Sequence, residues 1–161
     1  MFRPMRRFRQ ALSEEETRSI LQNGSYGVLA VAGDGGYPYA VPLNYVYADG
    51  KIYIHCARTG HKLDAIAASD KASFCVVEKS DVWAEKLTTL FRSAIVFGRA
   101  RLVTDDTEKR QSALKLAEKY SSCLSLERRE QEVEREWDAL AVIALTPEHI
   151  SGKQAIELLK K

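Results

Sequence analysis

The chain has 161 residues, of which 45% are hydrophobic and 29% charged, and this composition is that of a globular protein with one sizeable core. A formal net charge of +2 is too small to indicate a nucleic-acid partner, and no apolar run is long enough to cross a bilayer. We therefore expect a single domain over residues 1–161, located in the cytoplasm, in which residues 1–12 form a basic N-terminal arm.

The cysteines predict neither a disulfide framework nor a metal site. Cys56, Cys75 and Cys123 are odd in number and widely spaced, and the sequence has no Cys-x-x-Cys pair. Cys56 alternates with isoleucines along a strand, so we expect a buried small hydrophobic side chain there.

The first elements are a capped helix and a strand. Ser13 and Glu16 have the spacing of a capping box, which predicts a helix over residues 13–22. Residues 25–32 then have the composition of a strand, and the glycine-rich turn at 33–36 follows it. Since this turn leads into another strand rather than a helix, we do not interpret it as a nucleotide-binding loop.

Residues 37–47 and 51–57 are predicted to form a hairpin through the turn at 48–50, because β-branched and aromatic residues flank an Asp-Gly pair. Pro38 and Pro42 each remove a backbone donor, so the first of these strands must have a free edge. Two interpretations are open: the free backbone groups serve a planar heterocycle, or the prolines guard a barrel edge against aggregation.

A cationic corner follows the hairpin. Arg58, His61 and Lys62 surround a glycine at the predicted start of a helix over residues 62–68. Free N–H groups at a helix N-terminus, together with these charges, could bind a phosphate. The alternative is that Arg58 and Lys62 are solvated surface charges.

The rest of the chain predicts two helices, two straight strands and one bent strand. Strands are expected at 71–79 and 91–103, with Gly98 at a bulge, and helices at 104–120 and 126–136. An apolar run at 137–145 predicts a buried strand. These elements give an α+β chain, mainly β, whose sheet closes on itself.

Five segments, in order, resemble the flavin-binding split-barrel proteins of the pyridoxamine 5′-phosphate oxidase-like superfamily, and within it the 5-nitroimidazole resistance branch. They are residues 27–30 (GVLA), 36–45 (GYPYAVPLNY), 54–57 (IHCA), 60–64 (GHKLD) and 93–100 (SAIVFGRA). The resemblance implies a six-stranded Greek-key split β-barrel with flanking helices. It also implies FMN as cofactor, and a homodimer with FMN at the interface.

The same resemblance implies which residues contact FMN: Pro42, Leu43, Asn44, His55, Ala57, Arg58, His61, Lys62, Phe91, Arg92 and Ser93. A guanidinium at Arg92 near the flavin would favour the reduced anion, and a solvated strand-end arginine is the alternative. His55 is the candidate catalytic residue because an imidazole can transfer protons near neutral pH, although a lone histidine is more often structural.

The leading functional hypothesis is an FMN-dependent oxidoreductase that takes electrons from NAD(P)H and reduces a small acceptor such as a nitro-aromatic compound. A non-catalytic flavin-binding or haem-binding protein is the alternative. Oxidation of pyridoxamine phosphate is disfavoured, because residues 150–156 contain no counterpart of the arginine-rich substrate segment of that enzyme.

Overall fold

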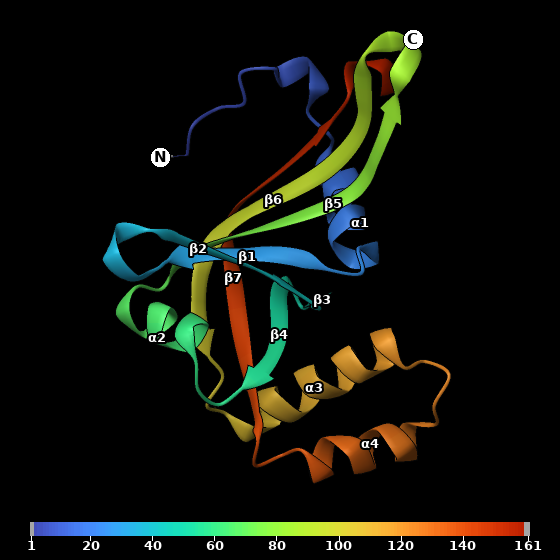
Figure 1. Cartoon of the computed structure of the whole chain (residues 1–161). Helices are drawn as coiled ribbons and strands as arrows, with labels where there is room; N and C mark the ends of the chain where they lie inside the picture. The colour runs from blue at the N-terminus through green and yellow to red at the C-terminus, as the bar shows by residue number, and fades with distance from the viewer. Residues whose placement is uncertain (1, 160–161) are drawn as a thin grey trace.

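A computed structural model describes residues 2–159 of the chain (Figure 1). Seven strands form one antiparallel sheet in the order β2-β1-β5-β6-β7-β4-β3. The strands are β1 (Gly27–Ala32), β2 (Pro38–Leu43), β3 (Val46–Ala48), β4 (Lys51–Ala57), β5 (Lys71–Trp83), β6 (Thr88–Leu102) and β7 (Leu140–Gln154). The helices are α1 (Glu14–Asn23), α2 (His61–Ala68), α3 (Asp106–Tyr120) and α4 (Leu126–Arg135), with short 3-10 turns at Phe8–Gln10, Asp34–Gly36, Ala84–Lys86 and Ile156–Leu158.

The predicted fold class, mainly β with flanking helices, is confirmed. The sheet curls on itself, and its inner face carries fully buried apolar side chains such as Leu29, Phe74 and Ile143. Ile20 and Leu21 of α1 are also fully buried in this core. Helix α3 covers a smaller cluster that includes Tyr53 and Val142. None of the described helices has the length and apolar character needed to span a membrane.

The strand count is seven rather than six because the strand expected at 37–47 is broken. It stops at Leu43 and resumes at Val46, and the intervening Tyr45 side chain is fully buried against Phe74. The expected hairpin is therefore wrong for most of its length: residues 46–48 pair with residues 51–53, whereas β2 pairs with β1. The Asp-Gly turn itself is confirmed, since Asp49 and Gly50 have φ angles of 52° and 73°.

Local signals at other element ends agree with the structure. The Ser13 side chain accepts a hydrogen bond from the Glu16 amide, and the Glu16 carboxylate accepts one from the Ser13 amide, which is a complete capping box. Gly98 lies at a shift in register between β6 and β7. A Cβ there would come within 2.1 Å of the Thr146 carbonyl oxygen, so only glycine fits.

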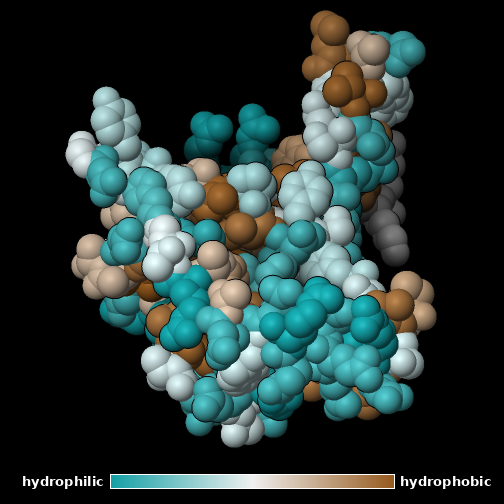
Figure 2. Space-filling view, turned by 60° about the horizontal axis from the view of Figure 1, so that its bottom comes forward, coloured by the Kyte–Doolittle hydropathy of each residue, from teal (hydrophilic) through white to brown (hydrophobic). Residues whose placement is uncertain are grey.

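Strands β5, β6 and β7 are longer than the sequence predicts. The β5–β6 hairpin projects from the barrel, with its turn at Ala84–Lys86 (Figure 1). The tip of this hairpin is hydrophobic (Figure 2) and includes Val82 and Leu87, which are 78% and 96% exposed. β7 starts at Leu140 and passes through Pro147, beyond the last residue that pairs with β4.

Candidate functional site

The barrel is split along a seam between β2 and β4. Among the described residues, β2 forms ladder pairs only with β1, and residues 54–57 of β4 form them only with β7. Both facing strand edges therefore keep backbone groups that no neighbouring strand satisfies. The expectation of a free edge beside Pro38 and Pro42 is confirmed.

One end of the seam opens into a hollow of about 350 Å³. It is lined by Tyr26, Pro42, Leu43, Asn44 and His55, so β2 and β4 both contribute to it. Four of these five residues were expected at a cofactor. Tyr26 was missed, although an aromatic residue just before the first strand is a signal that the sequence does contain.

His55 lies at this hollow, pairs with Val142 of β7 in the sheet, and has an exposed imidazole that forms no hydrogen bond with any other described residue. Its neighbours along β4, Ile54 and Tyr53, are buried. The Asn44 amide nitrogen Nδ2 donates to the carbonyl oxygen of Ser25 at 3.1 Å, which leaves the amide oxygen of Asn44 without a partner in the described chain. The lining of the hollow thus includes an imidazole and an amide oxygen that have no hydrogen-bond partner among the described residues.

The other end of the seam lies at α2, and Ala57 leads β4 towards it. The helix begins at His61 rather than Lys62, after Gly60, whose φ of 129° favours glycine. No side chain caps this helix N-terminus. β2 runs four residue steps, about 13 Å, from Leu43 at the hollow to Tyr39, whose ring contacts His61 of α2.

Arg58, His61 and Lys62 lie at this end of the seam and differ in whether the protein already supplies them with a partner. The Arg58 guanidinium donates to the carbonyl oxygen of Asp138 at 3.0 Å. The His61 ring stacks on Tyr39, with ring centroids 4.1 Å apart, and its Nε2 lies 3.6 Å from a carboxylate oxygen of Asp34.

Lys62 forms no ion pair or hydrogen bond within residues 2–159. Its ammonium group is close enough to Cys56 to oppose the effect of burial, which raises the pKa of that thiol. Lys62 is therefore the cation beside the seam that is available to a ligand.

The remaining expected contacts lie elsewhere in this chain. Phe91, Arg92 and Ser93 are on β6, and both β1 and β5 separate them from β2. The Arg92 guanidinium binds Glu78 at 2.6 Å and the Gln154 side-chain oxygen at 2.9 Å. Ser93 lines a larger groove of about 900 Å³ that includes the N-terminal arm and β7. One chain alone does not bring these residues to the hollow, and their role at a cofactor stays a prediction.

The outer face of the sheet carries a second feature. Strand pairing aligns two rows of residues that run across β2, β1, β5 and β6 in that order. The first row is Pro42, Val28, Cys75 and Ile95, and the second row is Ala40, Ala30, Ser73 and Phe97. The alternate residues Leu29, Phe74 and Val96 fill the core, so both rows point outward. Ile95 and Phe97 are each 39% exposed. This outer face, apart from Ser73, is apolar. No described helix covers it, and at its β6 end the Phe2 ring of the N-terminal arm stacks on Phe97 with the ring centroids 5.6 Å apart.

Comparison with known protein families identifies the family of this chain. A family model described as pyridoxamine 5′-phosphate oxidase matches residues 13–154. Comparison with curated protein sequences finds no significant match.

Three similar solved structures share the fold at low sequence identity. A conserved hypothetical protein from Mycobacterium tuberculosis is 17% identical with a TM-score of 0.83, over 98% of this chain and 95% of that one. An FAD and haem binding protein from Mycobacterium smegmatis is 20% identical with a TM-score of 0.76, over 94% and 76% of the two chains. A 5-nitroimidazole antibiotic resistance protein from Bacteroides thetaiotaomicron is 17% identical with a TM-score of 0.72, over 89% and 86%.

Proposed function

Since the chain belongs to the pyridoxamine 5′-phosphate oxidase family, we propose that it is a flavoprotein that binds FMN along the β2–β4 seam. The observation that carries this proposal is the seam itself. It combines a hollow, two strand edges with unused backbone groups, and the unpaired ammonium group of Lys62 at the α2 end. The planar ring would lie over the hollow, and the phosphate would lie at the uncapped end of α2.

The residues present fit such a cofactor. The exposed side chains of Pro42 and Ala57 are compact, so they leave a flat ring access to the strand edges. Lys62 would bind the phosphate directly, and the α2 amides would donate to it. Arg58 and His61 lie at the same end but already have partners in the protein, so we expect smaller contributions from them. When bound, the flavin supplies hydride and electron transfer.

We propose that the protein is a homodimer in which the outer sheet face is the interface. Monomeric proteins rarely expose large continuous apolar patches, and the two aligned rows place the exposed Ala40, Pro42, Ile95 and Phe97 on one sheet face. Pro42 belongs both to this face and to the hollow, so a second copy would come close to the flavin. Phe91, Arg92 and Ser93 of that copy could then reach the site that they do not reach within one chain.

The activity we propose is NAD(P)H-linked reduction of a small acceptor such as a nitro-aromatic compound. The position and exposure of His55 at the hollow support a role in proton transfer to the acceptor. Oxidation of pyridoxamine phosphate is disfavoured, because residues 150–156 have no arginine to hold that substrate.

The test is a spectrum of the purified protein followed by anaerobic addition of NADH or NADPH. We expect a yellow protein that releases FMN, bleaches with one of the nucleotides and regains its colour when a nitro-aromatic acceptor is added. Failure of the apo protein to bind FMN would contradict the flavoprotein assignment. FMN binding without reduction by either nucleotide would contradict the oxidoreductase and support the non-catalytic alternative.

A further inference from the structure

We propose that Tyr120, at the C-terminal end of α3, is a positioning residue that sets the shape of the flavin hollow. Its hydroxyl oxygen accepts a hydrogen bond from the Tyr45 amide at 2.9 Å. It also lies 2.8 Å from the Tyr45 carbonyl oxygen and 2.6 Å from the Ser25 carbonyl oxygen. The inference rests on the proposed function, since it concerns the same site.

One hydroxyl group can accept and donate at the same time, but it has only one proton to donate. The two carbonyl oxygens of Ser25 and Tyr45 therefore compete for that proton, and the shorter distance favours Ser25. The Tyr45 amide has no other hydrogen-bond partner among the described residues, and its side chain is fully buried. Tyr120 thus replaces the strand partner that the chain lacks between β2 and β3.

The two residues that Tyr120 holds are the chain neighbours of two residues that line the hollow. Ser25 precedes Tyr26, and Asn44 precedes Tyr45. The Ser25 carbonyl oxygen also accepts the hydrogen bond from Asn44 Nδ2, so Tyr120 and Asn44 share one acceptor. A displacement of Ser25 would change the orientation of the Asn44 amide, which lines the hollow.

Lys119, the residue before Tyr120, also joins the end of α3 to this part of the backbone. The Lys119 ammonium group donates to the Gly24 carbonyl oxygen at 2.6 Å and lies 4.1 Å from the centre of the Tyr45 ring. A Cβ at Gly24 would come within 2.7 Å of the Tyr45 hydroxyl, so the backbone is tightly enclosed here. The end of α3 therefore holds residues 24–25 and residue 45 together, although they lie far apart in sequence.

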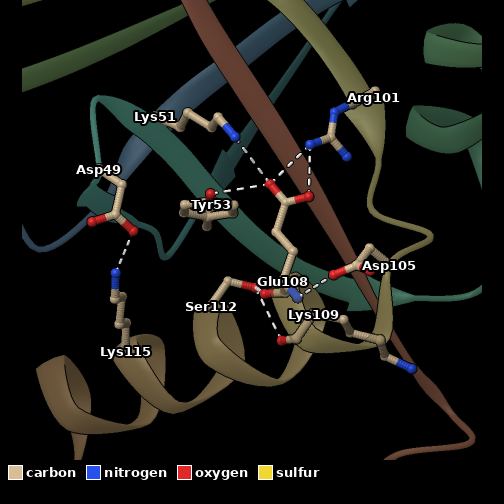
Figure 3. Close-up of polar contacts among 9 residues, drawn as sticks. All are labelled: Asp49, Lys51, Tyr53, Arg101, Asp105, Glu108, Lys109, Ser112 and Lys115. Atoms are coloured by element: carbon tan, nitrogen blue, oxygen red, sulfur yellow. Dashed lines mark hydrogen bonds and ion pairs between the residues drawn. The ribbon is translucent and has the colours of Figure 1, made fainter.

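The opposite end of α3 is attached separately, which makes a matched control available. Near its start, Glu108 accepts hydrogen bonds from Lys51, Tyr53 and Arg101 (Figure 3). The Tyr53 hydroxyl donates to Glu108 at 3.1 Å. Tyr53→Phe and Tyr120→Phe each remove one hydroxyl that joins α3 to the sheet. Only the Tyr120 hydroxyl, however, binds the backbone of residues 25 and 45, which adjoin the lining residues Tyr26 and Asn44.

The experiment titrates apo protein with FMN for the wild type and both variants. Because Tyr120→Phe leaves the Tyr45 amide unpaired, we expect about tenfold weaker FMN binding, whereas Tyr53→Phe should stay within about twofold of the wild type. Equal weakening in both variants would overturn the inference, because it would indicate general loosening of α3. Unchanged affinity in Tyr120→Phe would also overturn it.

Amide hydrogen exchange of the apo protein provides a readout that does not depend on flavin. We expect faster exchange at Tyr45 in Tyr120→Phe but not in Tyr53→Phe, and unchanged exchange in both would refute the hydrogen-bond role. If the wild type failed to bind FMN, the proposed function would be wrong, and this exchange measurement would still decide whether Tyr120 holds the break between β2 and β3.

Discussion

Glu108 holds α3 against the sheet, and we predict that Glu108→Gln destabilises the fold by about 2–3 kcal/mol. The carboxylate accepts two hydrogen bonds from Arg101 at 2.7 and 2.8 Å, and others from Lys51 at 3.2 Å and Tyr53 at 3.1 Å (Figure 3). A hydrogen bond to a charged group contributes about 1.5–3 kcal/mol. The expected total loss is smaller than the sum of these separate contributions. The side chains of Arg101 and Lys51 are 47% and 32% exposed, so they bind water again when the carboxylate is lost.

For a chain of this size, that loss corresponds to a decrease in melting temperature of about 4–12 °C. The control is Glu14→Gln, which removes the carboxylate of the exposed Glu14–Arg18 pair on α1. The Glu14 side chain is 77% exposed, and a surface pair of this kind contributes about 0.5 kcal/mol or less. Thermal unfolding of the three proteins at pH 7 measures both differences.

The pH dependence adds a second check. Hydrogen bonds from Arg101 hold the pKa of Glu108 below its usual value of 4.5, and burial opposes them. A carboxyl group whose pKa is lower in the folded state stabilises the fold above its unfolded pKa, and this contribution is lost as the pH falls through the folded pKa.

The difference between wild type and Glu108→Gln should therefore be constant from pH 6 to 9 and shrink below about pH 4.5. The hydrogen bond to Glu108 raises the pKa of Lys51, so the stabilisation from the Lys51–Glu108 pair is lost only when Lys51 loses its proton at higher pH. Equal melting temperatures at pH 7, or a difference that persists unchanged at pH 3, would refute the reasoning.

Three further predictions concern the proposed site and interface. Lys62→Ala should weaken FMN binding about tenfold to a hundredfold in a titration of apo protein. Lys86→Ala on the exposed β5–β6 turn is the control, and unchanged affinity in Lys62→Ala would remove Lys62 from the site. His55→Gln should keep FMN affinity while turnover falls by about 10²–10⁴-fold, and equal rates in both half-reactions by anaerobic stopped-flow would show that His55 is structural. Ile95→Glu should convert a dimer to monomers in sedimentation velocity, since it places a charge on the outer sheet face, and an unaltered dimer would exclude that face.

The sequence by itself determined the features that depend on a few neighbouring residues. The capping box of Ser13 and Glu16, the turn at Asp49 and the bulge at Gly98 were all readable because their physical causes lie within a few positions of the chain. The alternation of buried and exposed residues also indicated the strand type. The family motifs placed Pro42 and His55 at one site, and the structure brings them to one hollow.

Only the tertiary structure decided which strands meet and where they stop. The break at Asn44 and Tyr45 depends on a hydroxyl group 75 residues away, and nothing near Tyr45 in the sequence specifies that partner. β5 continues beyond residue 79 through the polar Ser80 and Asp81, because β6 supplies the ladder partners that local propensity does not. Arg92 could be named as a cofactor contact from its motif, but its carboxylate partner Glu78 comes from the neighbouring strand. Long-range hydrogen bonds and ion pairs depend on register and curvature, and these are properties of the assembled sheet rather than of any short stretch of the chain.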